Sequence, residues 1–284
     1  MLTRGPRMEA DAIGLVGHHR SMARIGDYAT APDAAPAGWV TAGLRGFASS
    51  VLSVVPVGFQ AYVRIFHPAQ RRDGVGWEPV SWREVAAANG RVAHRAMQWC
   101  ALVGCCSLSG DDCRPQPGVW DVEPAVGHLP RDLAIVLAEV LAGQTTTPQR
   151  CWFAVWDGFG DLAVPDADGC SFAVPQRRML LLAGAIRAVG TSSLSLAPGW
   201  QSPNLWWPDD RAWCVATEID LMSTYVGGSR GGVQAIIEHP QVEAAAVKPS
   251  DGIAADSDAI NPSVHQAPAP TGAHGRRRGR PSQR

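Results

Sequence analysis

Lysine and asparagine are almost missing from this chain of 284 residues. Lys248 is the one lysine, and asparagine occurs only at positions 89, 204 and 261. Both amino acids have A·T-rich codons, whereas the abundant alanine, glycine, proline and arginine have G·C-rich codons. The shortage therefore indicates a G·C-rich genome, and the dominance of arginine among the basic residues is not by itself a sign of guanidinium chemistry.

The chain also lacks a long continuous hydrophobic run. Its longest uncharged stretch, residues 46–63, is interrupted by Pro56, Gln60 and three serines. A membrane-spanning helix needs about 20 predominantly apolar residues. Near the start of the chain, charged side chains surround a short apolar patch at residues 13–16, which is not the core of a signal peptide. We therefore expect neither a membrane span nor export through a signal peptide.

No class of residue dominates strongly enough to indicate a fibrous or disordered protein. Hydrophobic residues make up 46% of the chain and charged residues 18%, and the net charge is −1. This balance excludes a collagen, a coiled coil and a wholly disordered chain. Seven cysteines are too few for a disulfide scaffold of this length, and they lie in apolar contexts such as residues 151–153. We expect reduced, buried thiols and a cytoplasmic location.

Motifs for common cofactors and metals are absent as well. No phosphate-binding loop, dinucleotide fingerprint or G-x-S-x-G elbow occurs, so we expect no cofactor. Zinc sites typically use paired cysteines two to four residues apart, and adjacent cysteines rarely bind one tetrahedral ion together. Cys100, Cys105, Cys106 and Cys113 are separated by four, zero and six residues. The spacing therefore predicts no zinc site.

The two ends of the chain differ from its middle. Residues 254–284 contain no aromatic residue and only two large aliphatic ones, so they cannot bury enough apolar surface to order themselves. Residues 1–38 hold a single aromatic residue and end in an Ala- and Pro-rich run that is typical of a linker. All eleven tryptophans lie between these ends. We predict a poorly ordered extension over 1–38, a single domain over 39–253 and a disordered arginine-rich tail over 254–284.

The middle of the chain predicts an α+β fold. Helical patterns come early and strand patterns come late, which favours a largely antiparallel sheet packed with two to three helices over alternating βαβ units. Ser81 and Glu84 form a capping box, and helical spacing continues from there to Val103. Further helices are predicted over 130–143 and 229–239, and strands over 58–67, 151–156, 178–183 and 212–219.

The end of the tail is strongly basic. Its last nine residues hold five arginines, while the chain as a whole is slightly acidic. Residues 277–281 resemble the core of an AT-hook, although the proline usual before that core is replaced by Arg277 and only one copy is present. The resemblance implies weak DNA contact through residues 276–284, with glycine on the floor of the minor groove and arginines along it. The residues concerned are Arg277, Arg278, Gly279, Arg280 and Pro281. A G·C-rich reading frame is the alternative source of this segment.

A tryptophan-rich segment after residue 205 is a candidate interaction surface. Tryptophan and arginine often anchor protein interfaces when they become desolvated. The alternative is a turn whose aromatic rings pack inward while its charged groups stay in solvent. The candidate interaction residues are Trp206, Trp207, Asp209, Asp210 and Arg211.

Carboxylates in the loop after residue 156 offer a candidate acid and base. Asp157 and Asp161 could act as such a pair, although aspartates in Gly-rich loops more often serve turn geometry. Asp166 and Asp168 begin like a calcium loop, but its twelfth position is Arg177, so we expect no calcium there.

Three segments, 56–68, 151–158 and 202–220, resemble a family of cytoplasmic proteins from high-G·C bacteria over about residues 54–261. No activity is assigned to that family, so the resemblance implies no catalytic residue. The leading hypothesis is a non-catalytic binding or interaction module whose partner is an unknown protein or small molecule. The alternatives are a DNA-associated protein that acts through its tail, and a hydrolase-type enzyme. The weak catalytic candidates for such an enzyme are Asp157, Asp161, Glu218 and His67.

Overall fold

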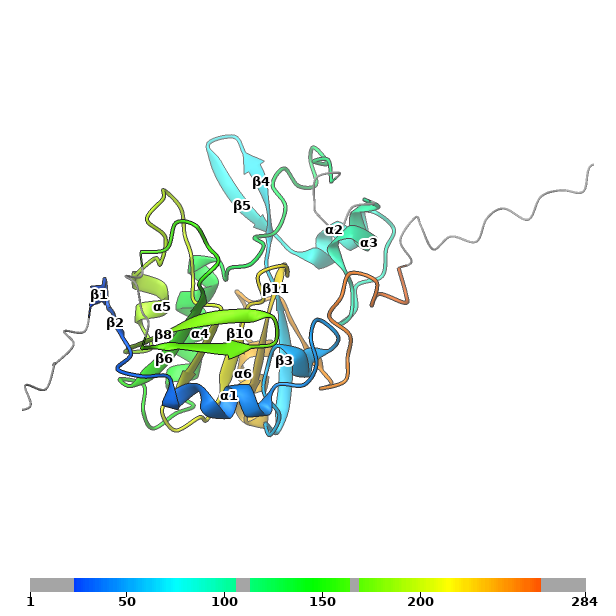
Figure 1. Cartoon of the computed structure of the whole chain (residues 1–284). Helices are drawn as coiled ribbons and strands as arrows, with labels where there is room; N and C mark the ends of the chain where they lie inside the picture. The colour runs from blue at the N-terminus through cyan, green and yellow to red at the C-terminus, as the bar shows by residue number, and fades with distance from the viewer. Residues whose placement is uncertain (1–22, 106–112, 164–168, 262–284) are drawn as a thin grey trace, which may run out of the picture.

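The structure is a computed structural model, and it describes residues 23–105, 113–163 and 169–261. Within these ranges the fold is built on a ten-stranded antiparallel sheet, with strand order β1-β2-β8-β6-β9-β10-β11-β3-β12 and β7 beside β8 (Figure 1). This confirms the predicted α+β class and the largely antiparallel sheet. The sheet strands are β1 (Arg24–Ile25), β2 (Tyr28–Thr30), β3 (Ala61–Phe66), β6 (Cys151–Trp156), β7 (Ser171–Val174), β8 (Arg177–Gly184), β9 (Leu205–Pro208), β10 (Cys214–Ala216), β11 (Ser223–Gly228) and β12 (Ala244–Val247).

One face of the sheet is covered by helices. The long helix α4 (Arg131–Ala142) turns Leu133, Leu137 and Leu141 toward the sheet because these residues recur every four positions. The short α5 (Ala188–Thr191) and the amphipathic α6 (Arg230–Ile237) pack beside it. We call this the helix-covered face. On this face, apolar side chains at regular helical spacing pack against the strands and leave a closed core.

The opposite face is covered by irregular segments. The 3-10 turn η1 (Ala35–Ala37), helix α1 (Gly38–Gly43) and the turn η2 (Val51–Ser53) lie across it together with the loops that join them (Figure 1). We call this the loop-covered face. Because its cover is assembled from short pieces, it closes only part of the sheet.

A separate cluster of aromatic side chains lies at one end of the sheet and includes Phe66, Trp82, Trp99 and Trp120. The capping box predicted at Ser81 starts α2 (Trp82–Ala88): the Glu84 amide donates to Ser81 Oγ at 3.2 Å, and the Ser81 amide donates to Glu84 Oε2 at 2.8 Å. Helix α3 (Trp99–Val103) packs against α2 through the Trp82 and Trp99 rings. The hairpin of β4 (Ala69–Asp73) and β5 (Gly76–Val80) projects from the same region (Figure 1).

Two expectations about local structure are wrong. The helix predicted from Ser81 to Val103 is split, because Gly90 adopts a positive φ of 63° and residues 91–98 bond to another segment instead of continuing the helix. There the Val92 amide donates to Asn261 Oδ1 at 2.9 Å. The strand predicted over 212–219 is shorter, since only Cys214–Ala216 pairs as β10. The described part of the chain contains six α-helices, of which α4, α5 and α6 pack on one face of the sheet.

At both ends the described structure extends beyond the predicted domain bounds of 39 and 253. Tyr28, which falls in the predicted extension, is fully buried and pairs within β2. Asp258 and Asn261, which fall in the predicted tail, are buried too. Hydrogen bonds hold them where hydrophobic burial cannot: His94 Nε2 and Asp258 Oδ1 are 2.9 Å apart, and Asn261 Nδ2 donates to the Val92 carbonyl at 2.9 Å.

Candidate ligand-binding cavity

A cavity of about 480 Å³ lies in the loop-covered face. The ends of the central strands form its floor, and segments 44–54, 98–100 and 253–256 form its sides. In the strand register, Leu205 pairs with Ala216, Ala216 with Tyr225, and Tyr225 with Arg64, so these residues form one row across β9, β10, β11 and β3. Ala216 leaves space in this row because its side chain is a single methyl group.

The inner wall carries a buried arginine. Arg64 is 2% exposed, and its guanidinium is held by oxygen atoms from three directions. Its Nε donates to Ser223 Oγ at 3.0 Å. Its Nη1 donates to the carbonyls of Met97 at 2.8 Å and Arg95 at 3.4 Å. Its Nη2 donates to Gln98 Oε1 at 3.3 Å. Arg64 therefore fixes the segment that replaces the middle of the predicted helix, and that segment is part of the cavity wall.

Aromatic rings complete the surroundings of this guanidinium. The Arg64 Cζ atom lies 4.7 Å from the ring centre of Phe66, 5.3 Å from that of Trp82 and 5.8 Å from that of Tyr225. Such rings stabilise a cation through their quadrupoles. Burial lowers the pKa of Arg64. No carboxylate of the described residues lies within salt-bridge distance of it. The wall thus presents a cation that carbonyls and rings stabilise in place of a counter-ion.

A second arginine stands at the rim. The Arg177 guanidinium lies 5.5 Å from the ring centres of both Phe47 and Trp156. Its Nη2 also donates to Glu218 Oε1 at 3.2 Å and to Asp220 Oδ2 at 3.1 Å. Arg177 therefore links two aromatic rings and two carboxylates from three other segments of the chain.

Backbone strain is concentrated beside this rim. The described residues contain three non-glycine residues with a positive φ: Ala48 at 49°, Gln176 at 59° and Arg211 at 56°. Ala48 directly follows Phe47, and Gln176 directly precedes Arg177. An L-residue pays about 1–2 kcal/mol in this left-handed region, and such strain clusters at ligand clamps and active sites. Two of the three residues with a positive φ therefore lie beside the rim, Gln176 in the turn between β7 and β8 and Ala48 in the loop after α1.

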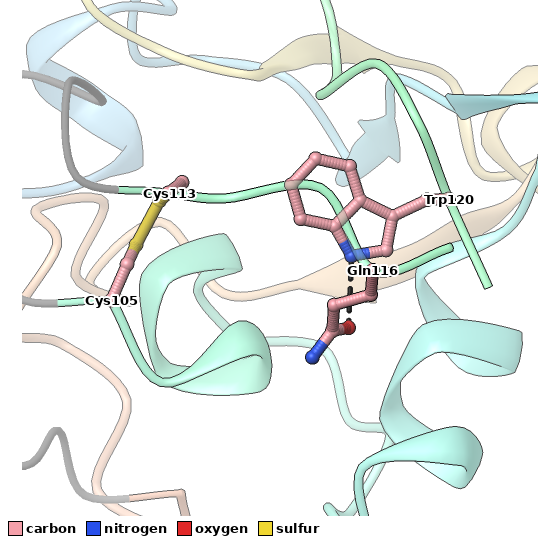
Figure 2. Close-up of a disulfide and its surroundings, with 4 residues drawn as sticks. All are labelled: Cys105, Cys113, Gln116 and Trp120. Atoms are coloured by element: carbon pink, nitrogen blue, oxygen red, sulfur yellow. Dashed lines mark hydrogen bonds between the residues drawn. A yellow bond between two sulfur atoms is a disulfide. The ribbon is translucent and has the colours of Figure 1, made fainter. Parts of the chain in front are cut away.

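One side of the cavity adjoins a group of cysteines. Cys100, in α3, lines the cavity, and burial together with the nearby Glu123 carboxylate raises the pKa of its thiol. Cys105 and Cys113 form a disulfide (Figure 2). The expectation that all the cysteines are reduced is therefore wrong for this pair. The sequence could not indicate it, because the pairing depends on how the chain folds back after α3.

The weak catalytic candidates do not converge. His67 is fully buried beneath the helix-covered face, where its Nδ1 lies 2.7 Å from the Ala125 carbonyl and its Nε2 2.9 Å from Thr224 Oγ1. Burial lowers its pKa to about 3, so it is neutral near pH 7. Since a carbonyl can only accept, Nδ1 carries the proton and Nε2 accepts from Thr224. His67 is a satisfied core histidine and does not line the cavity.

The two loop aspartates, Asp157 and Asp161, form contacts near the protein surface. Asp157 forms an ion pair with Arg178 at 3.2 Å, and Asp161 accepts a hydrogen bond from Ser195 Oγ at 2.6 Å. Neither lines the cavity, so Glu218 is the one member of the candidate catalytic set that does. This separation gives no support to an acid and base acting together.

The candidate interaction surface is divided between core and solvent. Trp206 and Trp207 are 0% and 1% exposed, and they point to opposite faces of the sheet, so neither can contact a partner. Asp209, Asp210 and Arg211 stay exposed. The prediction is therefore wrong for the two tryptophans, because both faces of β9 are covered and alternation along the strand buries both rings.

The exposed charged residues of this turn have structural contacts. Asp210 accepts hydrogen bonds from Thr145 Oγ1 at 2.7 Å and from the Thr146 amide at 2.8 Å. The Asp209 carboxylate accepts from Trp152 Nε1 at 3.0 Å. Asp210 therefore holds the loop at residues 145–146 against the end of β9, and Asp209 holds the Trp152 side chain of the neighbouring strand β6.

Some of the sequence predictions lie outside the described residues. These include Asp166, Asp168, Cys106 and the DNA-binding candidates Arg277, Arg278, Gly279, Arg280 and Pro281. Within the described ranges, every helix is too short or too polar to cross a membrane.

Sequence reasoning missed the main features of the cavity. Arg64 lies within the strand predicted over 58–67, but nothing in that pattern indicated that its guanidinium is buried. Phe47, Trp156 and Arg177 come from distant parts of the chain, and no local pattern joins them. Comparisons of this chain with protein-family models, with curated proteins and with solved structures found no match.

Proposed function

We propose that this protein is a non-catalytic module that binds a small, largely apolar ligand in the cavity of the loop-covered face. The observation that carries the proposal is the cavity itself: about 480 Å³ of space with a mainly apolar lining and a small number of polar groups. Ligand sites typically measure about 300–1,000 Å³ and combine apolar walls with a few convergent polar groups. Packing voids in protein interiors are usually no larger than a water molecule.

The polar groups suit binding better than catalysis. Ser223 Oγ accepts a hydrogen bond from Arg64, and Glu218 is paired with Arg177. The raised pKa of Cys100 keeps its thiol protonated, which weakens it as a nucleophile. No histidine lies among the described residues that line the cavity. These contacts supply orientation and charge, but they do not pair a nucleophile with a base.

The arrangement of charge indicates where a ligand would lie. The wall offers aromatic surfaces from Trp82, Trp99 and Trp156, while cations stand at its inner end and at its rim. A flat apolar body fits between these surfaces, and an acidic substituent can approach either arginine. The aromatic walls also provide a signal, since tryptophan fluorescence reports a ligand bound nearby.

The binding proposal is tested with two fluorescent probes that differ in one group. 1-Anilinonaphthalene-8-sulfonate has a phenyl ring, a naphthalene ring system and a sulfonate, and N-phenyl-1-naphthylamine has the same ring systems without the charge. We expect saturable binding of the first probe at one site per chain, with energy transfer from tryptophan. Weaker binding of the second probe would assign a role to the arginines. Binding without saturation, or at many sites, would contradict the proposal.

Variants locate the site of binding. Ala216→Leu fills the floor and is expected to weaken probe binding by more than about 10-fold, equivalent to about 1.4 kcal/mol. Phe47→Ala removes one ring from the rim, and Trp77→Ala is its matched control. Trp77 is also an exposed ring stacked on an arginine, with Arg72 Cζ 5.8 Å from its centre, but it lies on the β4–β5 hairpin. Equal effects of the two ring removals would count against the cavity.

A second candidate function is favoured by the clustering of five arginines in residues 276–284. We infer that this segment makes weak contacts with the minor groove of A·T-rich DNA. Five phosphate contacts would give a log–log salt dependence no steeper than about −4.5. Fluorescence anisotropy of the full chain and of a 1–275 truncation on A·T-rich and G·C-rich duplexes tests this. Equal affinity for both duplexes would reject the AT-hook resemblance.

A further inference from the structure

Three sulfur atoms meet at the end of α3. The Sγ atoms of Cys100, Cys105 and Cys113 all lie within 4.8 Å of one another, and the latter two are joined as a disulfide (Figure 2). We propose that this three-cysteine cluster is a redox-controlled site for a thiophilic dication, with Zn²⁺ as the best match. In the reduced state the three thiols lose their protons as the ion binds and hold it as thiolates, and the structure shows the oxidised state.

The first two cysteines are positioned by the end of α3. Gly104 adopts a positive φ of 73° and ends the helix, and the amides of Gly104 and Cys105 both donate to the Cys100 carbonyl, at 2.9 and 3.2 Å. This left-handed turn folds Cys105 back beside Cys100. Helix α3 is itself fixed by Trp99, whose ring centre lies 5.5 Å from that of Trp82 and 5.2 Å from that of Trp120.

The third cysteine is positioned by a separate anchor. Residues 116 and 120 form a small backbone bridge, and Trp120 Nε1 donates to Gln116 Oε1 at 2.9 Å (Figure 2). The Gln116 side chain also exchanges two hydrogen bonds with Asn89 at the end of α2, at 2.9 and 3.0 Å. Cys113 is thus held three residues from a docked segment. Because both arms are held by contacts other than the disulfide, reduction leaves the three sulfurs near one another.

The other described cysteines lie apart from this cluster. Cys151, Cys170 and Cys214 are buried at 1%, 3% and 0% exposure within the cores on the two faces of the sheet. None of them joins a cluster of potential metal ligands in the described residues. The three-cysteine cluster is less deeply buried, since Cys100 and Cys113 keep part of their surface, so an ion and a small oxidant can reach it.

The chemistry of the donors selects the ion. Thiolates prefer Zn²⁺ and other soft or borderline metals over Mg²⁺ and Ca²⁺, which take oxygen ligands. Three protein ligands leave the fourth tetrahedral position for water or another small donor. The spacing of the cysteines predicted no zinc site, but spacing alone does not include the turn at Gly104 or the packing of Trp99 on Trp120.

Oxidation releases the ion in a balanced step. The thiolates of Cys105 and Cys113 each give up one electron and form the S–S bond. A peroxide accepts the two electrons with two protons and leaves as two waters when it is H₂O₂, while the Zn²⁺ passes to solvent. A dithiol reverses the reaction: it reduces the bridge and is itself oxidised to a disulfide.

The test measures metal retained by the full-length chain. Protein reduced under anaerobic conditions is incubated with ZnCl₂, freed of excess metal and analysed for zinc, and a parallel sample with CoCl₂ is examined by absorption. We expect one equivalent of zinc and a sulfur-to-cobalt charge-transfer band. The same chain oxidised with H₂O₂ should retain no zinc, and dithiothreitol should restore binding. This oxidised arm involves no mutation, so it does not depend on the folding of a variant.

Serine variants assign the ligands. Cys100→Ser and Cys113→Ser should each weaken zinc binding by more than about 100-fold, because loss of an outer-shell partner alone costs about 10–100-fold. Cys170→Ser is the matched control and should bind like the unchanged chain. The proposal is overturned if the reduced chain retains no stoichiometric zinc, if Cys100→Ser retains it fully, or if the oxidised chain retains it. None of these outcomes depends on whether the neighbouring cavity binds a ligand.

Discussion

The two faces of one sheet are covered in different ways. On the helix-covered face, α4 and α6 place apolar side chains at regular intervals and leave a closed core. On the loop-covered face, α1, two 3-10 turns and the chain between them leave a cavity of about 480 Å³. The same strands supply both faces by alternation. The difference therefore comes from the covering segments: periodic helices close a sheet, whereas short irregular pieces leave space that a ligand can use.

The two faces also differ in the protonation state of the basic side chain that each one buries. In and just after β3, Arg64 points to the loop-covered face and His67 lies beneath the helix-covered face. Carbonyls and rings surround Arg64, and it remains a cation. His67 is sealed and neutral. A closed apolar core excludes charge, whereas the lining of the cavity tolerates it, and this contrast supports four predictions.

The largest expected effect is the pH dependence due to His67. Its pKa is about 3 in the folded chain and near 6.5 when exposed, so the unfolded chain binds more protons between these values. Stability is therefore fully present above about pH 6.5 and falls as the pH drops toward 3, by as much as about 4–5 kcal/mol. Urea unfolding between pH 4 and 7 measures this loss. His67→Gln should show a shallower slope, and parallel profiles for the two proteins would reject the sealed environment.

Truncating one leucine on each face compares how tightly the two faces are packed. Leu182 is fully buried on the helix-covered face, and Leu205 is 6% exposed and lines the cavity. Truncation of a buried leucine to alanine costs about 2–5 kcal/mol, and the cost rises with the empty volume that is created. We expect about 3–5 kcal/mol for Leu182→Ala and about 2 kcal/mol for Leu205→Ala, because Leu205 already borders open space. Equal losses in urea unfolding would show that the faces are equally packed.

The sequence was sufficient where local signals and packing agree. Helix α4 follows from its apolar spacing between Pro130 and Gly143, and the capping box at Ser81 forms the predicted pair of bonds. Strand β6 matches the predicted residues 151–156. Each of these elements is specified within a dozen residues, so tertiary contacts strengthen a preference that is already present.

The cavity could not be predicted in the same way, because its parts meet only through tertiary contacts. A pattern of alternation cannot tell a strand with one solvent face from a strand with two covered faces, and both Arg64 and Trp206 are buried because their strands are covered on both faces. The predicted helix after Ser81 is interrupted because Asn261, which falls in the predicted disordered tail, bonds to the backbone of Val92. Long-range polar contacts of this kind leave no periodic trace in the sequence.

Filling each face with a larger residue should produce different results. Ala134 is fully buried in α4 on the helix-covered face, and Ala216 lies on the cavity floor. Extra methylenes in a closed core cost about 1–3 kcal/mol, because neighbouring side chains must move. We expect that cost for Ala134→Leu and less than about 1 kcal/mol for Ala216→Leu, whose side chain enters open space. Thermal unfolding of both variants measures it, and a cost for Ala216→Leu as large as that for Ala134→Leu would show that the cavity is closed.

The smallest effect concerns the strained rim. Ala48 has a φ of 49°, so Ala48→Gly relieves about 1–2 kcal/mol of strain and loses about 0.4–1 kcal/mol through the freer unfolded chain. The expected net gain is between zero and about 1.6 kcal/mol. Ala235→Gly, in the middle of α6, is the matched control and should instead lose about 0.5–1 kcal/mol. If the strain holds Phe47 against Arg177, Ala48→Gly should also weaken binding of 1-anilinonaphthalene-8-sulfonate while it stabilises the fold. A stabilised variant with unchanged probe affinity would show that the strain at Ala48 does not contribute to binding. The position of Phe47 would then depend on its contact with Arg177 alone.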